Sequence, residues 1–522
     1  MAVVFGIPDW VILVFTAIFL LYLRVSRHRN HWKKQNVPHE GYAFLFGPML
    51  KIMRKPFHEL DQERYEKYGR IYGMFESGKP SLFVAEPELV KQVLVKDFLI
   101  LPNRRSGDFF EPLVDNMLSV VAYPRWKTIR GCFSPAFTSV KLRKMEDQIE
   151  ACTKTTVEHL QKAAEQERDV ELGQFFGNFS LDLIARCAFG TRIDSHSDES
   201  NDFVTYAKKA FGKDFSLGLI IYFLLPGVAK YFRIKIFNQG TLRYFKSLSQ
   251  SAIKGRLDSK MRQDDFLQIL IDSQKGTDVS DTSKENTESN ERIFDVDSKF
   301  TNSEGVSSKA LSEDEAMAQC FMFLVAGQGT TSSLVAFTLY LLALNPEAQN
   351  KLREEADLCV QKHGEYPSME VVSKLEYLHG VISETLRMFP PASRLERETI
   401  QDYVLGDTGI KIPKNCVVAV PVYAMHHDPD YFPDPHVFRP ERFMSENASN
   451  IQPFTYLPFG AGPRNCVGMR LGLHAAKMAV LHSVLNAQFV RTDKTKVPLD
   501  FFKGFGVMSS SDITVGVRKR AS

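Results

Sequence analysis

Three long apolar runs stand out in this chain, and the first lies at its N-terminus. Residues 1–23 read MAVVFGIPDWVILVFTAIFLLYL and carry a single charge, at Asp9. An apolar stretch of this length matches the thickness of the hydrocarbon core of a bilayer. The pattern therefore predicts one transmembrane helix over residues 1–23.

The segment that follows this run sets its expected topology. Its basic side chains are Arg24, Arg27, Arg29, Lys33 and Lys34, and such residues stay on the cytosolic side of a membrane helix. A cleaved signal peptide is the alternative, but its positive charges precede the apolar run and a small-residue cleavage site follows it. We expect an uncleaved anchor, a basic juxtamembrane linker over residues 24–50 and one cytosolic domain over residues 51–522.

The second apolar run, residues 316–346, contains no charged residue. Ser312 and Glu315 form a capping box before it, and Pro346 ends it. By hydropathy alone this run would pass for a second membrane helix. Its flanks are acidic, at Glu315 and Glu347, so no positive flank would orient it in a membrane. We expect a fully buried central helix of about 45 Å.

The third apolar run, residues 215–228, is short for a membrane helix and contains Pro226. A core helix and a surface patch that dips into the membrane both remain compatible with it. Residues 275–310 have the opposite character, because Ser, Thr, Asp, Glu, Asn and Lys dominate them. Such a composition cannot bury enough apolar surface to order itself, so we expect a mobile polar insert.

The remaining periodic segments complete the predicted fold class. Residues 371–389 place apolar side chains at helical spacing, and Pro390 ends the predicted helix. Glu384 and Arg387 are three residues apart on it and therefore share a face. Strands are predicted at residues 81–85, 416–423 and 513–517. The expected fold is mainly α-helical with a smaller β-rich region.

Composition excludes several classes of protein. Lys and Arg total 65 against 62 for Asp and Glu, a net charge of +3, which gives no reason to expect nucleic acid as a partner. The seven cysteines include no CxxC pair, so neither a disulfide framework nor a structural zinc site is expected. This pattern of cysteines fits a reducing compartment.

One cysteine, Cys466, lies in the glycine-rich loop FGAGPRNCVG. A nucleophile would need a nearby base, which any of the 13 histidines could supply, but no motif supports that interpretation. A phosphate-binding loop fails because the third glycine of GxGxxG would fall at Asn465. A thiolate ligand of haem iron fits the pattern. Gly462 and Gly468 would let the backbone approach a flat ring, and Arg464 could pair with a propionate.

The same loop matches the signature Phe-x-x-Gly-x-Arg-x-Cys-x-Gly of the cytochrome P450 superfamily at every fixed position. Other stretches resemble landmarks of that superfamily in the same order, namely WKTIR (126–130), AGQGTT (326–331), ETLR (384–387) and PERF (440–443). NRR (103–105) and RLER (394–397) resemble most the microsomal clan of 3-type, xenobiotic- and steroid-oxidising enzymes. The resemblance covers essentially everything after the predicted anchor.

The resemblance implies a role for each matching residue. Cys466 would be the axial ligand of the haem iron, with Phe459 shielding its thiolate and Gly468 allowing the ring to approach. The haem propionates would be held by Arg104, Trp126, Arg130, Arg397 and Arg464. A structural triad of buried charges is implied for Glu384, Arg387 and Arg442.

The implied activity is that of a haem-thiolate monooxygenase anchored in the endoplasmic reticulum membrane. It would insert one atom of O2 into a lipophilic small molecule, using haem b and electrons from NADPH. The chain has no flavin or nicotinamide motif, so a separate NADPH-dependent reductase must dock, with cytochrome b5 as a further candidate partner. Lys127 and residues 141–144 carry basic side chains for that contact. Substrate contacts are expected at residues 104–122, Phe211, 321–326, 392–395 and 504–508.

The chain departs from the family pattern at one position. Gly329 replaces the acid that usually precedes the threonine, and Gln328 lies beside it. Thr330 remains as the candidate catalytic residue that positions protons. Two alternatives therefore stay open, a reductase-independent isomerase or dehydratase that acts on a peroxide, and a non-catalytic haem-binding protein.

Overall fold

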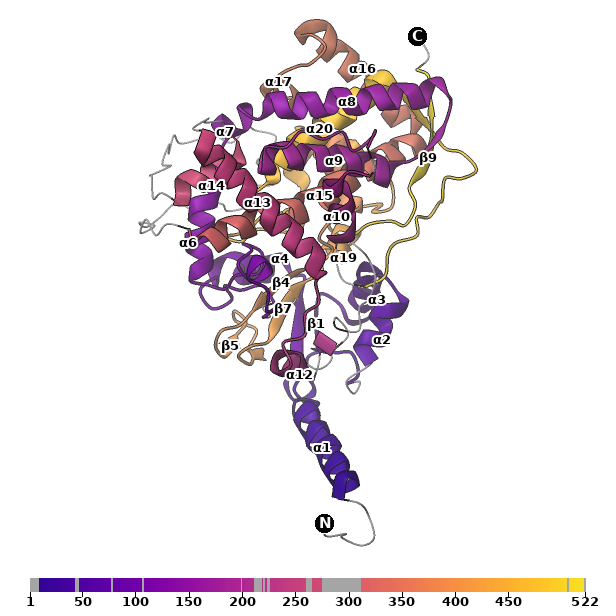
Figure 1. The fold of residues 1–522 in the computed structure, drawn as a ribbon. Helices are drawn as coiled ribbons and strands as arrows, with labels where there is room; N and C mark the ends of the chain where they lie inside the picture. Colours follow the sequence, from indigo (N-terminus) through magenta and orange to yellow (C-terminus); the bar gives the residue numbers. More distant parts are fainter. Residues whose placement is uncertain are drawn as a thin grey trace.

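The computed structural model describes most of the chain. Its described residues are 9–42, 47–76, 78–105, 108–198, 200–210, 218, 221–222, 226–259, 265–274, 311–504 and 507–520. The predicted polar insert (275–310), Phe211 and most of the third apolar run lie outside these ranges. Helices form most of the body, and the largest sheet lies towards the end from which the N-terminal helix projects (Figure 1).

Helices and strands are labelled as in Figure 1. The helices are α1 (Asp9–Ser26), α2 (Gly47–Arg54), α3 (Phe57–Tyr68), α4 (Pro87–Lys91), α5 (Pro112–Asp115), α6 (Arg125–Phe133), α7 (Ser139–Arg143), α8 (Glu146–Glu165), α9 (Leu172–Phe189), α10 (Asp202–Ala210), α12 (Pro226–Tyr231), α13 (Gln239–Ser259), α14 (Phe266–Gln274), α15 (Glu313–Leu344), α16 (Pro346–His363), α17 (Met369–Ser373), α18 (Glu376–Met388), α19 (Val422–His426) and α20 (Met469–Asn486). The strands are β1 (Ile71–Glu76), β2 (Lys79–Val84), β3 (Asp169–Glu171), β4 (Leu395–Glu398), β5 (Tyr403–Val404), β6 (Lys411–Ile412), β7 (Val417–Val420), β8 (Gln488–Val490) and β9 (Thr514–Arg518). The fold is therefore mainly α-helical with a smaller β-rich part, as predicted.

The second apolar run forms α15, at the centre of the fold (Figure 1). Its capping box is present, because the Ser312 N–H donates to Glu315 Oε2 at 2.8 Å and the Glu315 N–H donates to Ser312 Oγ at 3.2 Å. Helices α5, α9, α13, α14, α18 and α20 pack against it. Among the described helices it alone is long and apolar enough to span a membrane. Its neighbours instead bury residues 315–321 and 332–343, as expected for a core helix. The prediction of a fully buried helix was wrong for its middle, because residues 325–331 keep accessible surface.

The helix predicted over residues 371–389 is in fact two helices, α17 and α18, with a short break between them. Glu355 on α16 explains the break, because its carboxylate accepts the N–H groups of Tyr377 and Leu378, both at 2.8 Å. Amides in the first turn of a helix have no partner within that helix. A side chain that is distant in sequence thus starts a new helix inside a continuous apolar stripe.

The largest sheet has the strand order β1-β2-β7-β4. At its β4 edge, Asn103 forms an antiparallel bridge to Glu398, whose N–H donates to Asn103 O at 2.8 Å. The strand predicted over residues 416–423 ends earlier, because Pro421 has no N–H for the ladder and α19 begins at Val422. Two smaller sheets have the orders β3-β9-β8 and β5-β6.

The N-terminal helix α1 points away from the body (Figure 1). Its exposed apolar side chains include Trp10, Leu13, Val14, Phe15, Phe19, Leu20, Tyr22 and Leu23. The segment after α1 packs on the large sheet, where Trp32 is fully buried and its Nε1–H donates to Met74 O at 2.8 Å. The indole leaves no room for a side chain at Gly73. The end of α1 is therefore tied closely to β1.

Candidate active site

The loop that carries Cys466 is a tight turn before α20. The Cys466 N–H donates to Phe459 O at 2.9 Å and closes the loop on itself. Gly460 and Gly462 have φ angles of 72° and 71°, which side chains disfavour. A Cβ at Gly462 would also lie 2.1 Å from Leu94 O. Packing within the protein therefore requires Gly462, whatever binds beside the loop.

Gly468 differs from these two glycines. Its φ is −90°, and a Cβ there would meet Phe137 at an ordinary contact distance of 3.6 Å. Packing within the protein does not demand glycine at this position. The close approach of a bound group remains the reason that the sequence suggests.

Cys466 is the most accessible of the seven cysteines. Its side chain has accessible surface although protein surrounds it on all sides. Burial raises the pKa of the thiol, while the Gly468 N–H and the cations Arg130 and Arg104 act in the opposite direction. A thiol placed in this way is shielded from bulk water but open to a bound group.

Two arginines from separate segments hold the backbone on the N-terminal side of Cys466. Arg104 Nη2 donates to Arg464 O at 3.2 Å. On α6, Arg130 Nη1 and Nη2 donate to Asn465 O at 3.0 Å and to Asn465 Oδ1 at 2.8 Å. Both guanidinium groups are close enough to the thiol to influence its pKa. The loop, the Arg104 segment and α6 therefore form one assembly.

Arg464 and Arg397 complete a group of four cations. Arg464 Nε donates to Pro102 O at 2.6 Å, and its guanidinium lies 4.5 Å from the centre of the Trp126 ring. Arg397 is only 2% exposed, and its Nη1 donates to the Glu396 carbonyl at 2.8 Å while its Nε has no partner. The structure thus brings together all the arginines, and the tryptophan, to which the resemblance assigns the haem propionates.

The four arginines are electrostatically unbalanced. Burial, followed by repulsion from neighbouring arginines, lowers the pKa to about 8 for Arg464 and about 9 for Arg397. Burial also lowers the pKa of Arg130 to about 10, although the Cys466 thiol acts in the opposite direction. Burial also lowers the pKa of Arg104. Within the described part of the chain, no carboxylate forms an ion pair or hydrogen bond with any of them. Buried cations without partners are unfavourable, so the site calls for an anionic ligand.

This set of side chains fits an iron porphyrin. A cysteine thiolate is one of the axial ligands that proteins supply to haem iron. Guanidinium groups pair bidentately with carboxylates, and haem carries two propionates. The enclosed thiol and the unpaired arginines therefore meet the two chemical requirements of such a group at one place.

The middle of α15 also borders accessible space. Ala326 is exposed and residues 327–331 are partly exposed, although both flanks of the helix are buried. Phe137 connects this region to the cysteine loop, because its ring stacks at 6.2 Å on Phe323 of α15 and would touch a side chain at Gly468. The central helix and the loop therefore border neighbouring parts of the interior.

Within this stretch, Thr330 Oγ1 donates to Ala326 O at 2.6 Å. A Cβ at Gly329 would have no atom within 4 Å, so there is open space at that position. The Gln328 side chain points to α9, where its Nε2 lies 3.5 Å from the place of a Cβ at Gly177. Two residues along a helix are about 200° apart, so Gln328 and Thr330 occupy opposite faces. Gln328 therefore does not assist Thr330.

The charges of ETLR and PERF meet in the core. Arg387 Nε and Nη2 donate to the two carboxylate oxygens of Glu384, each at 2.8 Å, and Arg442 Nε donates to Glu384 Oε1 at 3.3 Å. Arg387 also donates to the carbonyls of His426 and Pro435, each at 2.8 Å. Glu384 and Arg387 are completely buried. These contacts are those of a structural element, since the buried charges are satisfied by one another and by backbone carbonyls.

One expectation for a substrate contact changes in the structure. Phe321 is 2% exposed and packs on Phe245 with ring centres 5.6 Å apart, so it belongs to the core. Met322 and Phe323 keep partial exposure and remain available. Of the other expected contacts, Phe211 and residues 106–107 and 505–506 lie outside the described residues.

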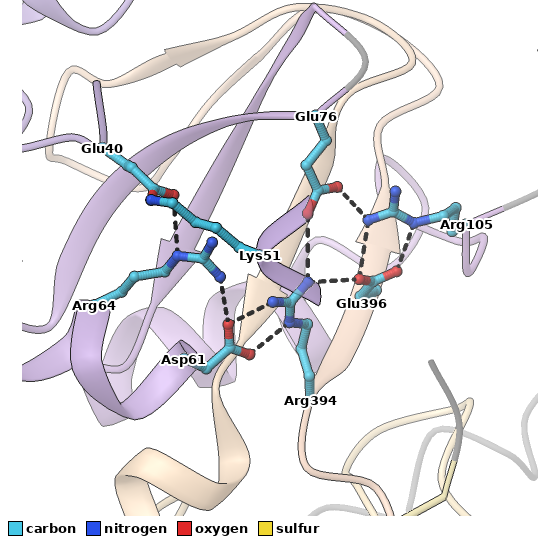
Figure 2. A network of polar contacts seen from close by, with 8 residues as sticks. All are labelled: Glu40, Lys51, Asp61, Arg64, Glu76, Arg105, Arg394 and Glu396. Atoms are coloured by element: carbon cyan, nitrogen blue, oxygen red, sulfur yellow. Dashed lines mark hydrogen bonds and ion pairs between the residues drawn. The ribbon is translucent and has the colours of Figure 1, made fainter. Parts of the chain in front are cut away.

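Sequence analysis missed the partners of Arg105 and Arg394, which lie beside two of the site arginines. They belong to an ion network with Glu40, Lys51, Asp61, Arg64, Glu76 and Glu396 (Figure 2). The signal available in the sequence was the alternation of side chains between the two faces of a strand. In RLER, Arg394 and Glu396 share one face while Arg397 points to the other. The distant partners in α3 and β1 could not be read from that pattern.

Comparison with known proteins identifies the family. The family model described as Cytochrome P450 matches residues 38–514. The chain is similar to cytochrome P450 3A17 of Cavia porcellus, with 35% identity over 95% of this chain and 93% of the relative. It is also similar to cytochrome P450 3A41 of Mus musculus, with 35% identity over 95% and 93%. Cytochrome P450 3A7 of Homo sapiens shows 34% identity over 99% and 97%. The chain therefore belongs to the cytochrome P450 family.

Proposed function

We propose that this enzyme oxidises a lipophilic small molecule in the accessible space beside Cys466. As a cytochrome P450 it is a monooxygenase that uses haem b and O2, with electrons from NADPH supplied through a reductase. The observation that carries the site assignment is the enclosed thiol surrounded by four arginines, to which the described residues offer no carboxylate partner. Bound haem supplies the oxygen chemistry, which a thiolate ligand favours.

The residues around this space have separate tasks in this proposal. Cys466 Sγ is the iron ligand, and Phe459 packs beside it. The propionates are held by Arg104, Trp126, Arg130, Arg397 and Arg464. Because these arginines repel one another before the ligand binds, carboxylates at their centre relieve the repulsion. Glu384, Arg387 and Arg442 hold the fold around the loop and take no part in the chemistry.

Thr330 positions protons for the reaction. Its hydroxyl is held by a hydrogen bond to Ala326 O, on the accessible side of α15. Gly329 offers no titrating group, but the open space there admits a water molecule. A water at this point would need polar partners, and the Thr330 hydroxyl and helix carbonyls are at hand. This arrangement replaces the acid that the family usually has.

The substrate class follows from what faces the interior. Described residues among the expected substrate contacts, including Phe323, Ala326 and Leu395, are apolar and keep accessible surface. Mostly apolar sites with few polar groups select lipophilic ligands.

The proposed location is the endoplasmic reticulum membrane. The exposed apolar side chains of α1 suit a single-pass anchor, with the basic residues after it in the cytosol. Membrane attachment would place the enzyme beside its reductase, with cytochrome b5 as a second candidate electron donor. Lys127 and the basic residues at 141–144 offer a positive face to an acidic partner.

Labelled dioxygen tests the reaction class. With NADPH, reductase and a substrate found by spectral-shift screening, the label should appear in the product. Product formed from a hydroperoxide without reductase would instead favour the isomerase or dehydratase alternative. Haem binding without turnover of any ligand from the screen would favour a non-catalytic haem protein.

A further inference from the structure

At the β4 edge, four charged side chains lie on two opposite faces. They are those of Arg104, Arg105, Glu396 and Arg397. Asn103 pairs with Glu398 in an isolated antiparallel bridge, which brings the Arg104–Arg105 segment beside Glu396 and Arg397. Successive side chains of extended backbone point to opposite faces. In β4, Glu396 and Arg397 therefore point to opposite faces. Arg104 lies on the Arg397 face, where it donates to Arg464 O of the cysteine loop, and Arg105 lies on the other face, where it donates to Glu396.

The second face carries an ion network that links three separate parts of the chain (Figure 2). Arg105 Nε donates to Glu396 Oε2 at 2.9 Å, and its Nη2 contacts Glu76 of β1. Arg394 lies between three carboxylates. Its Nε donates to Asp61 Oδ2 at 2.7 Å, and its Nη1 lies 3.4 Å from Glu76 and 3.3 Å from Glu396. Strand β4 is thereby tied to β1 and α3.

Charge is balanced across this network. Its cations are Lys51, Arg64, Arg105 and Arg394, and its anions are Glu40, Asp61, Glu76 and Glu396. Its centre is deeply buried, since the side chains of Arg394 and Asp61 are 3% and 0% exposed. A buried ion pair resists displacement strongly, because moving one partner leaves the other uncompensated. The second face is therefore held rigidly in place.

The first face needs such support. Arg104, Arg397, Arg464 and Arg130 repel one another. Among the described residues, the Arg397 guanidinium donates one hydrogen bond, to the neighbouring Glu396 carbonyl. Arg104 and Arg397 are each one peptide bond away from a member of the balanced network. We propose that the ion pair of Arg105 and Glu396, with Arg394 behind it, positions Arg104 and Arg397 for the propionates of haem. Glu396, Arg105 and Arg394 are then positioning residues that never touch the cofactor.

This inference rests on the proposed propionate-binding role of Arg104 and Arg397. Its test is the variant Glu396→Gln, which keeps the side-chain shape and removes the charge shared by Arg105 and Arg394. The measurements on the full-length holoenzyme are the rate of haem transfer to excess apomyoglobin and the propionate bending bands in the resonance Raman spectrum. Loss of such supporting partners typically weakens a bound metal group by roughly ten- to a hundredfold. We expect haem release to accelerate by that order and the propionate bands to shift.

The matched control is Asp265→Asn. It breaks another ion pair of low exposure, in which Arg256 Nη2 lies 2.7 Å from Asp265 Oδ2 and both side chains are 9% exposed. Asp265→Asn should lower the unfolding temperature but leave haem release and the propionate bands unchanged. Equal acceleration in both variants, or wild-type release and bands in Glu396→Gln, would overturn the inference.

Two further variants keep the outcome decisive. If Glu396→Gln does not fold, Glu76→Gln removes one contact each from Arg105 and Arg394 and should shift the same two measurements less, whereas wild-type values would overturn the inference. Arg397→Met tests the proposed function alone. Normal haem release in Arg397→Met contradicts the propionate role itself. Rapid release in Arg397→Met with normal release in Glu396→Gln contradicts only the positioning role.

Discussion

The two faces of the β4 edge hold the same residue type in opposite electrostatic states. On one face, Arg394 and Arg105 have raised pKa values because carboxylates surround them, despite burial. On the other, Arg397 and Arg464 have lowered pKa values because they are buried among other cations. The first state is complete within the protein, whereas the second is completed only by a ligand. Buried arginine is thus structural or functional according to whether its counter-charge belongs to the chain.

The largest effect is expected from replacing the thiol beside the face whose arginines need a ligand. In Cys466→Ala the arginines remain but the iron ligand is gone, so the reduced carbon monoxide complex should lose the spectrum typical of thiolate-bound haem. Monooxygenase activity should fall below detection. Cys132→Ala, at a partly buried cysteine elsewhere, is the control and should retain both. A thiolate-type spectrum in Cys466→Ala would refute the site.

The difference between the two faces can be tested by replacing one arginine on each face with methionine. Arg394→Met removes the cation that pairs with the buried carboxylates of Asp61 and Glu396. It should reduce the free energy of unfolding by about 3–5 kcal/mol, with or without haem. Arg397→Met relieves repulsion and should change the cofactor-free protein by no more than about 1 kcal/mol. Urea unfolding of both variants in the cofactor-free state measures this difference. Equal losses would show that the arginine cluster is as balanced as the network.

The pH dependence of stability tests the charge-balanced face further. Although burial opposes it, Arg105 and Arg394 hold the pKa of Glu396 well below its usual range. A carboxylate of this kind stabilises the fold fully above its unfolded pKa of about 4.5, and this contribution is lost as the pH falls through the folded value. The difference in unfolding free energy between wild type and Glu396→Gln should be constant from about pH 8 to about pH 5 and should shrink below about pH 4. A difference that grows in acid would contradict the assignment.

The smallest structural effect is expected at Thr330, which belongs to neither face. Thr330→Ala should bind haem and consume NADPH as wild type does, because its loss removes only a hydroxyl on α15. Product formed per NADPH should fall and hydrogen peroxide should rise, since protons are no longer well placed. Ser332→Ala removes a hydroxyl that donates to Gln328 O at 2.7 Å on the same helix and serves as the control. Unchanged coupling in Thr330→Ala would favour the peroxide-dependent alternative.

Several local features were predictable because short-range rules decide them. The capping box at Ser312 and the end of α15 follow from residues that are near each other in sequence. The cysteine loop was predictable from its own residues, and the arginines around it from the resemblance to the cytochrome P450 superfamily. The break between α17 and α18 was not, because Glu355 on another helix supplies the cap. Likewise, Phe321 could not be assigned to the core before the position of Phe245 was known.

The sequence by itself determined which chemical groups this protein can use, namely one thiol in a glycine loop, the surrounding arginines and a threonine in the central helix. Only the tertiary structure decided which of the adjacent arginines are neutralised by the chain and which await a ligand. Arg104 is adjacent to Arg105 in the sequence, and Arg394 is only three residues from Arg397. Composition and spacing therefore cannot distinguish the structural arginines from those that bind a ligand. Strand alternation sends them to opposite faces, and carboxylates from α3 and β1 reach only one of those faces.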